Sequence, residues 1–206
     1  MEQTGQVIQQ GRQSLQQQRQ SLNSLQATNR NTRLVRFCEQ YSPSYQLEIC
    51  GDSDMCFFGE YPTLATLKCY YGKNAPLAWL VPQLTDLAVY SGSKDKLSTE
   101  QYKQCAFIIS SEYYYLKVSE LMLFFHRFKA GRYGRFYGSV DPLVITTSLR
   151  EFIKERAVAY ERHDQEERER KERESQKKAV TWEEYCMREY GEVRPHPFNT
   201  LKGGDI

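Results

Sequence analysis

Several features that mark common classes of protein are missing from this chain of 206 residues. No apolar run approaches the roughly 20 residues that a transmembrane helix needs, and the most apolar stretch, VSELMLFF, is far too short. The N-terminus also lacks the basic and then apolar organisation of a secretory signal. We therefore expect a soluble cytoplasmic protein with no membrane partner, whose six cysteines are reduced.

Motifs that cradle phosphates or mark a catalytic nucleophile are missing as well. The chain contains no Gly-x-x-x-x-Gly-Lys-Ser/Thr and no Gly-x-Gly-x-x-Gly after a strand. None of the three histidines, His126, His163 and His196, has the neighbouring serine or cysteine that marks a nucleophile. We predict no catalytic residue, no cofactor and no enzymatic activity.

Cysteine pairs with the spacing of a structural zinc site are also lacking. Cys38, Cys50, Cys56 and Cys69 are separated by eleven, five and twelve residues, whereas such sites usually present pairs two to four residues apart. Burial of the thiols is the better explanation, so we predict no metal site. The charges nearly cancel, with 28 Lys and Arg against 26 Asp and Glu, so any attraction to nucleic acid must come from a local cluster.

Composition then divides the chain into five segments. Residues 1–33 are Gln-rich with a weak heptad stripe of Ile8, Leu15 and Leu22, which fits either an oligomerising helix or a solvated tail. Residues 34–60 have loop composition, with a brief strand expected at 45–50. Residues 61–160 form the helical core domain, residues 161–179 a charged helical spacer, and residues 180–206 a short aromatic helix with a flexible tail.

Start and stop signals place the helices of the core. A short helix ends at Gly72, and Asn74 begins the next one. Ser98 and Gln101 form a capping box that starts a helix of about 30 residues, which runs to Lys129 unless the polar residues 110–112 split or bend it. Asp141 followed by Pro142 then starts another helix.

That last helix is expected to continue through the charged run ERHDQEERERKERESQKK, where Glu-first pairs four residues apart support it. A second capping box, Thr181 with Glu184, starts the aromatic helix, and Gly191 stops it. The predicted fold class is therefore all-α: a mainly helical bundle with a small Gly/aromatic hairpin or loop at about 131–138 and a long charged C-terminal helix.

One segment, HRFKAGRYGRFYGSVDP at residues 126–142, combines cations, aromatic rings and glycines with no acid before Asp141. In one interpretation its cations pair with phosphates and its tyrosines stack on unpaired bases. In the other, the aromatic rings cover the end of the core helix and the arginines stay in water. The predicted nucleic-acid-binding residues are Arg127, Lys129, Arg132, Tyr133, Arg135 and Tyr137.

Residues 62–160, and especially LKVSELMLFFHRFKAGRYGRFYGSVDPLVITTSLREFIKER, resemble an uncharacterised family of small helical proteins from gut anaerobes and their phages and mobile elements. The specific part is the Gly-rich basic-aromatic segment followed by Asp-Pro. This resemblance implies a genomic setting and no catalytic residues. The layout, a compact helical domain joined to a tail, is loosely similar to phage helicase loaders and replisome organisers.

The preferred hypothesis is a non-enzymatic adaptor associated with single-stranded nucleic acid, as a replication accessory of a phage or mobile element. Its C-terminal aromatic helix would bind a protein partner. The predicted partner-binding residues are Trp182, Tyr185, Tyr190 and Phe198. The alternative is a homo-oligomeric structural or assembly protein that uses its N-terminal and charged helices for subunit contacts. An inhibitor that masks another protein fits the same features.

Overall fold

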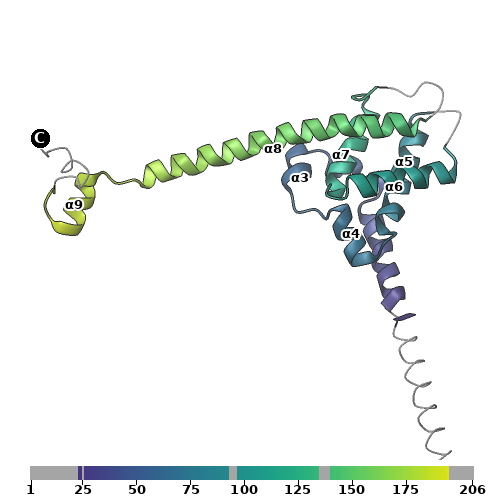
Figure 1. Cartoon of the computed structure of the whole chain (residues 1–206), viewed down its shortest axis with the longest axis horizontal. Coiled ribbons are helices and arrows are strands. Elements are labelled where there is room, and N and C mark those ends of the chain that lie inside the picture. The colour runs from purple at the N-terminus through teal and green to yellow at the C-terminus, as the bar shows by residue number, and fades with distance from the viewer. Residues whose placement is uncertain (1–22, 25, 93–96, 135–139, 195–206) are drawn as a thin grey trace, which may run out of the picture. The chain divides into compact units, whose positions relative to one another are not determined.

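The computed structural model describes residues 23–24, 26–92, 97–134 and 140–194. These residues are mainly helical and contain no strand, only an isolated bridge between Thr63 and Lys117, so the predicted all-α class is confirmed. The chain divides into two compact units, Met1–Ala157 and Val158–Ile206. Figure 1 shows α7, Val118–Lys129, close to α3, Ser53–Phe58, and α5, Ala75–Tyr90, in the first unit.

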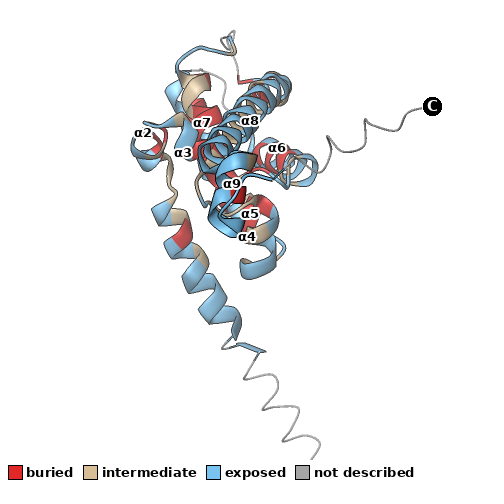
Figure 2. Ribbon diagram, turned by 90° about the vertical axis from the view of Figure 1, so that its left-hand side faces the viewer, coloured by how far each residue is buried: buried red, intermediate tan, exposed pale blue. Residues whose placement is uncertain are grey.

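Helix α7 forms the centre of the first unit. The hydrophobic run that makes its sequence stand out is buried in an unbroken stretch, which Figure 2 shows as red ribbon on α7. Helix α5 packs against it and buries Trp79 and Leu84, while α3 contributes Phe57. Phe124 makes several of the ring contacts of the core, among them one with Phe152 at 5.7 Å between centroids. A helix that is apolar around most of its circumference needs neighbours on every side.

The single long helix expected from Ser98 to Lys129 is wrong, because the chain breaks into α6, Thr99–Glu112, and α7. The hydroxyls of Ser110 and Ser111 bond back to the Phe107 and Ile108 carbonyls at 3.0 and 3.1 Å, a local alternative to helical bonding. The polar residues at 110–112 do mark the split.

Two carbonyls that the break exposes are used by the next element in space, α4, Leu64–Tyr71. The Leu64 and Ala65 amides donate to the Leu116 and Tyr114 carbonyls at 3.0 and 2.8 Å. These amides lie at the start of a helix, where no intrahelical acceptor exists. The carbonyls at the break and the amides at the start of α4 therefore satisfy each other's hydrogen bonds. Helix α4 ends as predicted, at Gly72, whose φ is 108°.

The strand expected at residues 45–50 is also wrong. A 3-10 turn at Pro43–Tyr45 leads into α2, Gln46–Ile49, and α3 follows. The Asp52 side chain caps α3 by accepting from the Asp54 and Met55 amides. Both short helices lie against α7, so the segment from 34 to 60 supplies part of the core.

The N-terminal helix, residues 26–40, is attached to α5 at its end. The Tyr41 carbonyl accepts from the Trp79 indole and from the Gln83 amide, both at 2.8 Å. Gln83 in turn accepts from the Gln46 amide at 2.6 Å. Fully paired buried amides of this kind fix one arrangement of the segments that they join. Along this helix only Phe37 is buried.

Helix α8, Pro142–Lys178, runs without interruption through the boundary between the two units, as the charge pattern predicted. Asp141 caps it, its carboxylate accepting from the Leu143 amide at 2.8 Å. The Glu167–Lys171 and Glu169–Arg173 pairs form at 4.0 and 3.1 Å. In the second unit, α9, Trp182–Tyr190, begins at the predicted capping box and ends at Gly191, whose φ of 70° is left-handed.

Candidate functional site

The basic-aromatic segment that follows α7 is organised around one carboxylate, Glu155 of α8. Arg127 donates to its Oε2 at 2.9 Å and to the Ser53 hydroxyl at 3.2 Å. Arg132 reaches its Oε1 at 3.0 Å, and the Tyr133 hydroxyl donates to Oε2 at 3.2 Å. Both oxygens of one acid thus hold three side chains of the predicted nucleic-acid-binding set.

Lys129 is neutralised in the same way on the other side of α7. It forms an ion pair with Asp86 and donates to the Gln46 side-chain oxygen at 2.8 Å. Only 16% of its side chain is exposed, and the same holds for Arg127, while 53% of Arg132 is exposed. The contacts of Arg127 and Lys129 count against the expectation that these two cations are available to a polyanion, since phosphate contact would require each to leave an acid of its own fold. For the half-exposed Arg132 the expectation stays a prediction.

The Tyr133 ring faces the core instead of solvent. Its centroid lies 5.5 Å from that of Phe124 and 6.1 Å from that of Phe128. Burial, with the neighbouring Glu155 carboxylate adding to it, raises the pKa of the Tyr133 hydroxyl. This ring therefore braces the end of α7, as in the second interpretation of the segment. Arg135 and Tyr137 lie outside the described residues, as does the rest of the predicted hairpin after Gly134.

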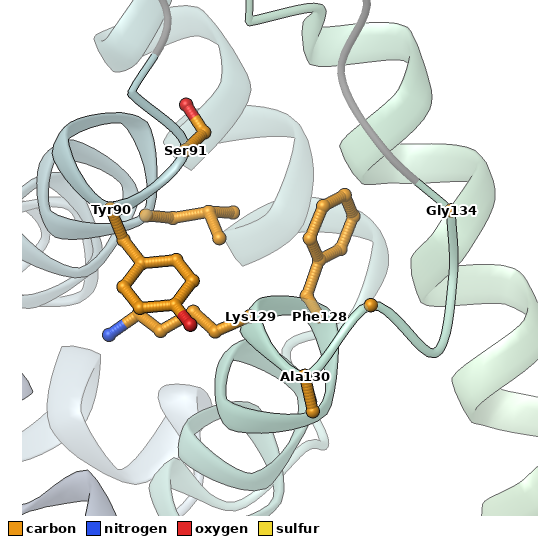
Figure 3. Close-up of a pocket in the computed structure, with 8 residues that line it drawn as sticks. Tyr90, Ser91, Phe128, Lys129, Ala130 and Gly134 are labelled. Atoms are coloured by element: carbon orange, nitrogen blue, oxygen red, sulfur yellow. The ribbon is translucent and has the colours of Figure 1, made fainter.

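A pocket of about 300 Å³ opens beside this segment, between the end of α5 and the end of α7. In Figure 3 the Tyr90 and Phe128 rings stand on opposite sides of it, and the Lys129 stem runs past the Tyr90 ring. The Lys129 ammonium lies 5.7 Å from the centroid of that ring, a cation–π contact. Among the described residues of the lining Lys129 is the one cation, and it already contacts Tyr90 and Asp86.

A second acid, Glu120, is completely buried in the first unit. Arg156 donates to its Oε1 at 2.6 Å, and the Lys117 amide donates to its Oε2 at 2.9 Å. The Arg156 guanidinium also lies 5.6 Å from the centroid of the Tyr115 ring. Both carboxylate oxygens are used within the fold, so Glu120 joins α7 to α8 and has no open side for a substrate.

The cysteines are unevenly accessible. Cys56 has no exposed surface and donates to the Ile49 carbonyl at 3.1 Å, although a hydrogen bond from Cys50 lowers its pKa. Burial raises the pKa of the Cys105 thiol to about 11. Cys38 is half-buried and Cys69 is exposed. Within the described ranges, no group of three or more His, Cys, Asp or Glu is arranged to hold a metal ion.

The aromatic helix α9 is capped at its start by the Thr181–Glu184 box and at its end by the Gly191 turn. Trp182 stacks on Tyr185 at 5.6 Å between centroids, and the Trp182 indole donates to the Arg194 carbonyl at 2.6 Å. The Arg194 guanidinium lies 4.2 Å from the centroid of the Tyr190 ring. The structure thus brings together three of the four predicted partner-binding residues, and the fourth, Phe198, lies outside the described residues.

A basic-aromatic groove that the sequence analysis missed lies between the N-terminal helix and the end of α4. Its cavity measures about 280 Å³ and is lined by Arg33, Arg36, Phe37, Gln40, Tyr70 and Tyr71. The two walls are 30 to 38 residues apart in the chain, so no short segment of the sequence indicates the groove. The available signal was the three-residue spacing of Arg30, Arg33 and Arg36, which places them near one another on a helix.

Comparison with known proteins gives one finding. Residues 96–193, just under half of the chain, match the model of a family of unknown function, DUF6633. This stretch begins later than the segment that carried the resemblance and extends past it through α9, so the aromatic helix lies inside the matched region. No curated protein and no solved structure matches the chain. Within the described part of the chain, no helix has both the length and the apolar character to cross a bilayer.

Proposed function

We propose that this protein is a non-enzymatic adaptor that associates with nucleic acid and binds a protein partner through α9. The single observation that carries the proposal is the exposed aromatic face of α9. Tyr185 and Tyr190 are exposed, and their ring centroids lie 6.3 Å apart, while Met187 is exposed on another side of the helix. The two rings leave an aromatic surface that the helix does not bury. Aromatic residues and methionine are the types enriched where proteins bind one another.

The way α9 is closed supports a recognition role. An isolated helix of nine residues is marginal in water, because helix nucleation is costly. The Thr181–Glu184 capping box, the Gly191 turn and the bond from Trp182 to Arg194 offset that cost locally. A preformed helix loses less conformational entropy when a partner binds it.

The chemistry of the first unit agrees with a non-enzymatic role. Glu120 and Glu155, its most engaged carboxylates, each have both oxygens occupied by side chains or amides of the same fold. A general base needs an oxygen within reach of a substrate proton. The replication-accessory role suggested by the resemblance stays a prediction.

One observation supports the alternative, an oligomeric assembly protein, and another counts against it. In this alternative the basic-aromatic segment only stabilises the core, and the contacts of Arg127 and Arg132 with Glu155 fit that role. The charged run of α8, residues 161–178, contains no aliphatic or aromatic residue, so it cannot supply the apolar seam of a coiled coil. We therefore keep the adaptor as the proposal.

The test captures partners from the native host with the full-length chain and with Tyr185→Ala/Tyr190→Ala. A protein retained by the wild type and lost with the double variant supports the proposal. The matched control is Lys177→Ala/Lys178→Ala, which changes exposed side chains at the end of α8 and should retain the protein. Equal capture by all three chains would refute the role of α9. A static light-scattering measurement that finds a stable oligomer would favour the alternative.

A further inference from the structure

The groove between the N-terminal helix and α4 is surrounded by cations that are unpaired among the described residues, whereas Arg127, Lys129 and Arg132 are paired with acids of the fold. Residues 26–41 and 61–74 together contain five cations and one acid, Glu39. The five cations are Arg30, Arg33, Arg36, Lys68 and Lys73. All five are exposed, and within the described residues none of them forms an ion pair. A cluster with one sign of charge attracts a polyanion even when the protein's net charge is small.

The aromatic side of the groove has one fixed ring and one free ring. Tyr71 is held by Phe37, with centroids 5.5 Å apart, and Phe37 is buried. Tyr70 is 72% exposed, and in the described part of the structure it makes no ring contact and no side-chain hydrogen bond. An exposed ring beside unpaired guanidinium groups provides both parts of a site for an unpaired nucleotide: a stacking face and phosphate contacts.

We propose that this groove binds single-stranded nucleic acid, with Arg33 and Arg36 contacting phosphates and Tyr70 stacking on a base. The inference rests on the proposed association with nucleic acid and places it on a different surface from the segment at 126–137. The two arginines are one helical turn apart, about 4.5 Å along the axis, so both can face one strand.

The exposed Tyr70 ring favours a single strand over a duplex as the ligand. In a duplex each base face is covered by its neighbours, so Tyr70 would have nothing to stack on and only the phosphate contacts would remain. Single strands of DNA and RNA share phosphates and free base faces, and the proposal covers both. An acidic peptide would satisfy the arginines and leave the ring unused.

The experiment is a fluorescence anisotropy titration of the full chain with labelled dT12 and rU12 at 50 and 200 mM salt. Two phosphate contacts predict that affinity falls about seven-fold between these concentrations. Arg33→Ala/Arg36→Ala should weaken binding and remove most of this salt dependence. Tyr70→Ala should weaken it about five-fold or more, and Tyr70→Phe should restore it.

Controls separate the groove from charge in general. Arg150→Ala/Lys103→Ala removes two exposed cations of the same unit and should bind as the wild type does. If the wild type binds neither oligonucleotide, the proposed association with nucleic acid fails. If the wild type binds and the groove variants bind equally well, only the placement in the groove is overturned. Equal competition by a duplex or by poly-glutamate would also overturn it, because the ring would then have no role.

Discussion

Removal of the Glu155 carboxylate tests whether the basic-aromatic segment is a brace. Glu155→Ala deletes the acceptor of Arg127, Arg132 and Tyr133 at once. The hydrogen bond to the mostly buried Arg127 is worth about 1.5–3 kcal/mol and that from Tyr133 about 1 kcal/mol. Arg132 is half-exposed, so solvent screening reduces its share to about 0.5 kcal/mol. Because the three share one acid and are not additive, we expect a total loss of about 3 kcal/mol.

The assay is urea unfolding followed by circular dichroism at neutral pH. The matched control is Glu151→Ala, which removes an acid one turn earlier on α8 whose partner, Lys154 at 2.9 Å, is exposed, and should cost under about 0.5 kcal/mol. Arg127→Met, alone and combined with Glu155→Ala, completes a double-mutant cycle with an expected coupling of at least about 1 kcal/mol. A loss for Glu155→Ala no larger than that of the control, or a coupling near zero, would refute the brace.

Three further outcomes follow from buried or capped groups. Arg156→Met leaves the Glu120 carboxylate buried without its ion-pair partner and should cost about 3–5 kcal/mol in urea unfolding, more than Arg156→Met combined with Glu120→Gln. Burial raises the pKa of the Cys105 thiol from 9.0 to about 11. The stability that the protonated thiol contributes is therefore complete below pH 9 and is lost as the pH rises through 11. Cys105→Ala should make the free energy of unfolding decline less steeply between pH 9 and 11. Thr181→Ala removes the cap of α9 and should weaken this helix by about 1 kcal/mol, seen as faster amide hydrogen exchange over residues 182–190, whereas an unchanged exchange rate would contradict the role of the cap.

Local signals in the sequence predicted the helix ends well. Ser98, Asp141, Thr181 and Gly191 act where their side chains or backbone freedom indicate, because capping needs only residues a few positions apart. The class of the fold followed from the same signals. The break between α6 and α7 was harder to place, since it depends on hydrogen bonds to α4, which lies about 50 residues earlier.

The function of the cations was harder still to predict from the sequence. The segment at 126–137 contains no acid, so its cations looked unpaired. Their acids come from other helices: Glu155 pairs with Arg127 and Arg132, and Asp86 pairs with Lys129. Conversely, Arg33 and Tyr70 become neighbours only through the packing of two distant segments. Whether a charge is neutralised depends on tertiary contacts, which spacing along the chain does not encode.

The Tyr41 carbonyl, which accepts from both Trp79 and Gln83, links the position of the N-terminal helix to the fluorescence of a tryptophan. The indole of Trp79, one of two tryptophans, donates to that carbonyl at 2.8 Å and has almost no exposed surface. Displacement of the helix at 26–40, together with Tyr41, from α5 breaks this hydrogen bond and exposes the indole to water. The maximum of the tryptophan fluorescence then shifts to longer wavelength. In a Trp182→Phe background, that emission would follow the docking of the N-terminal helix in real time without any attached dye.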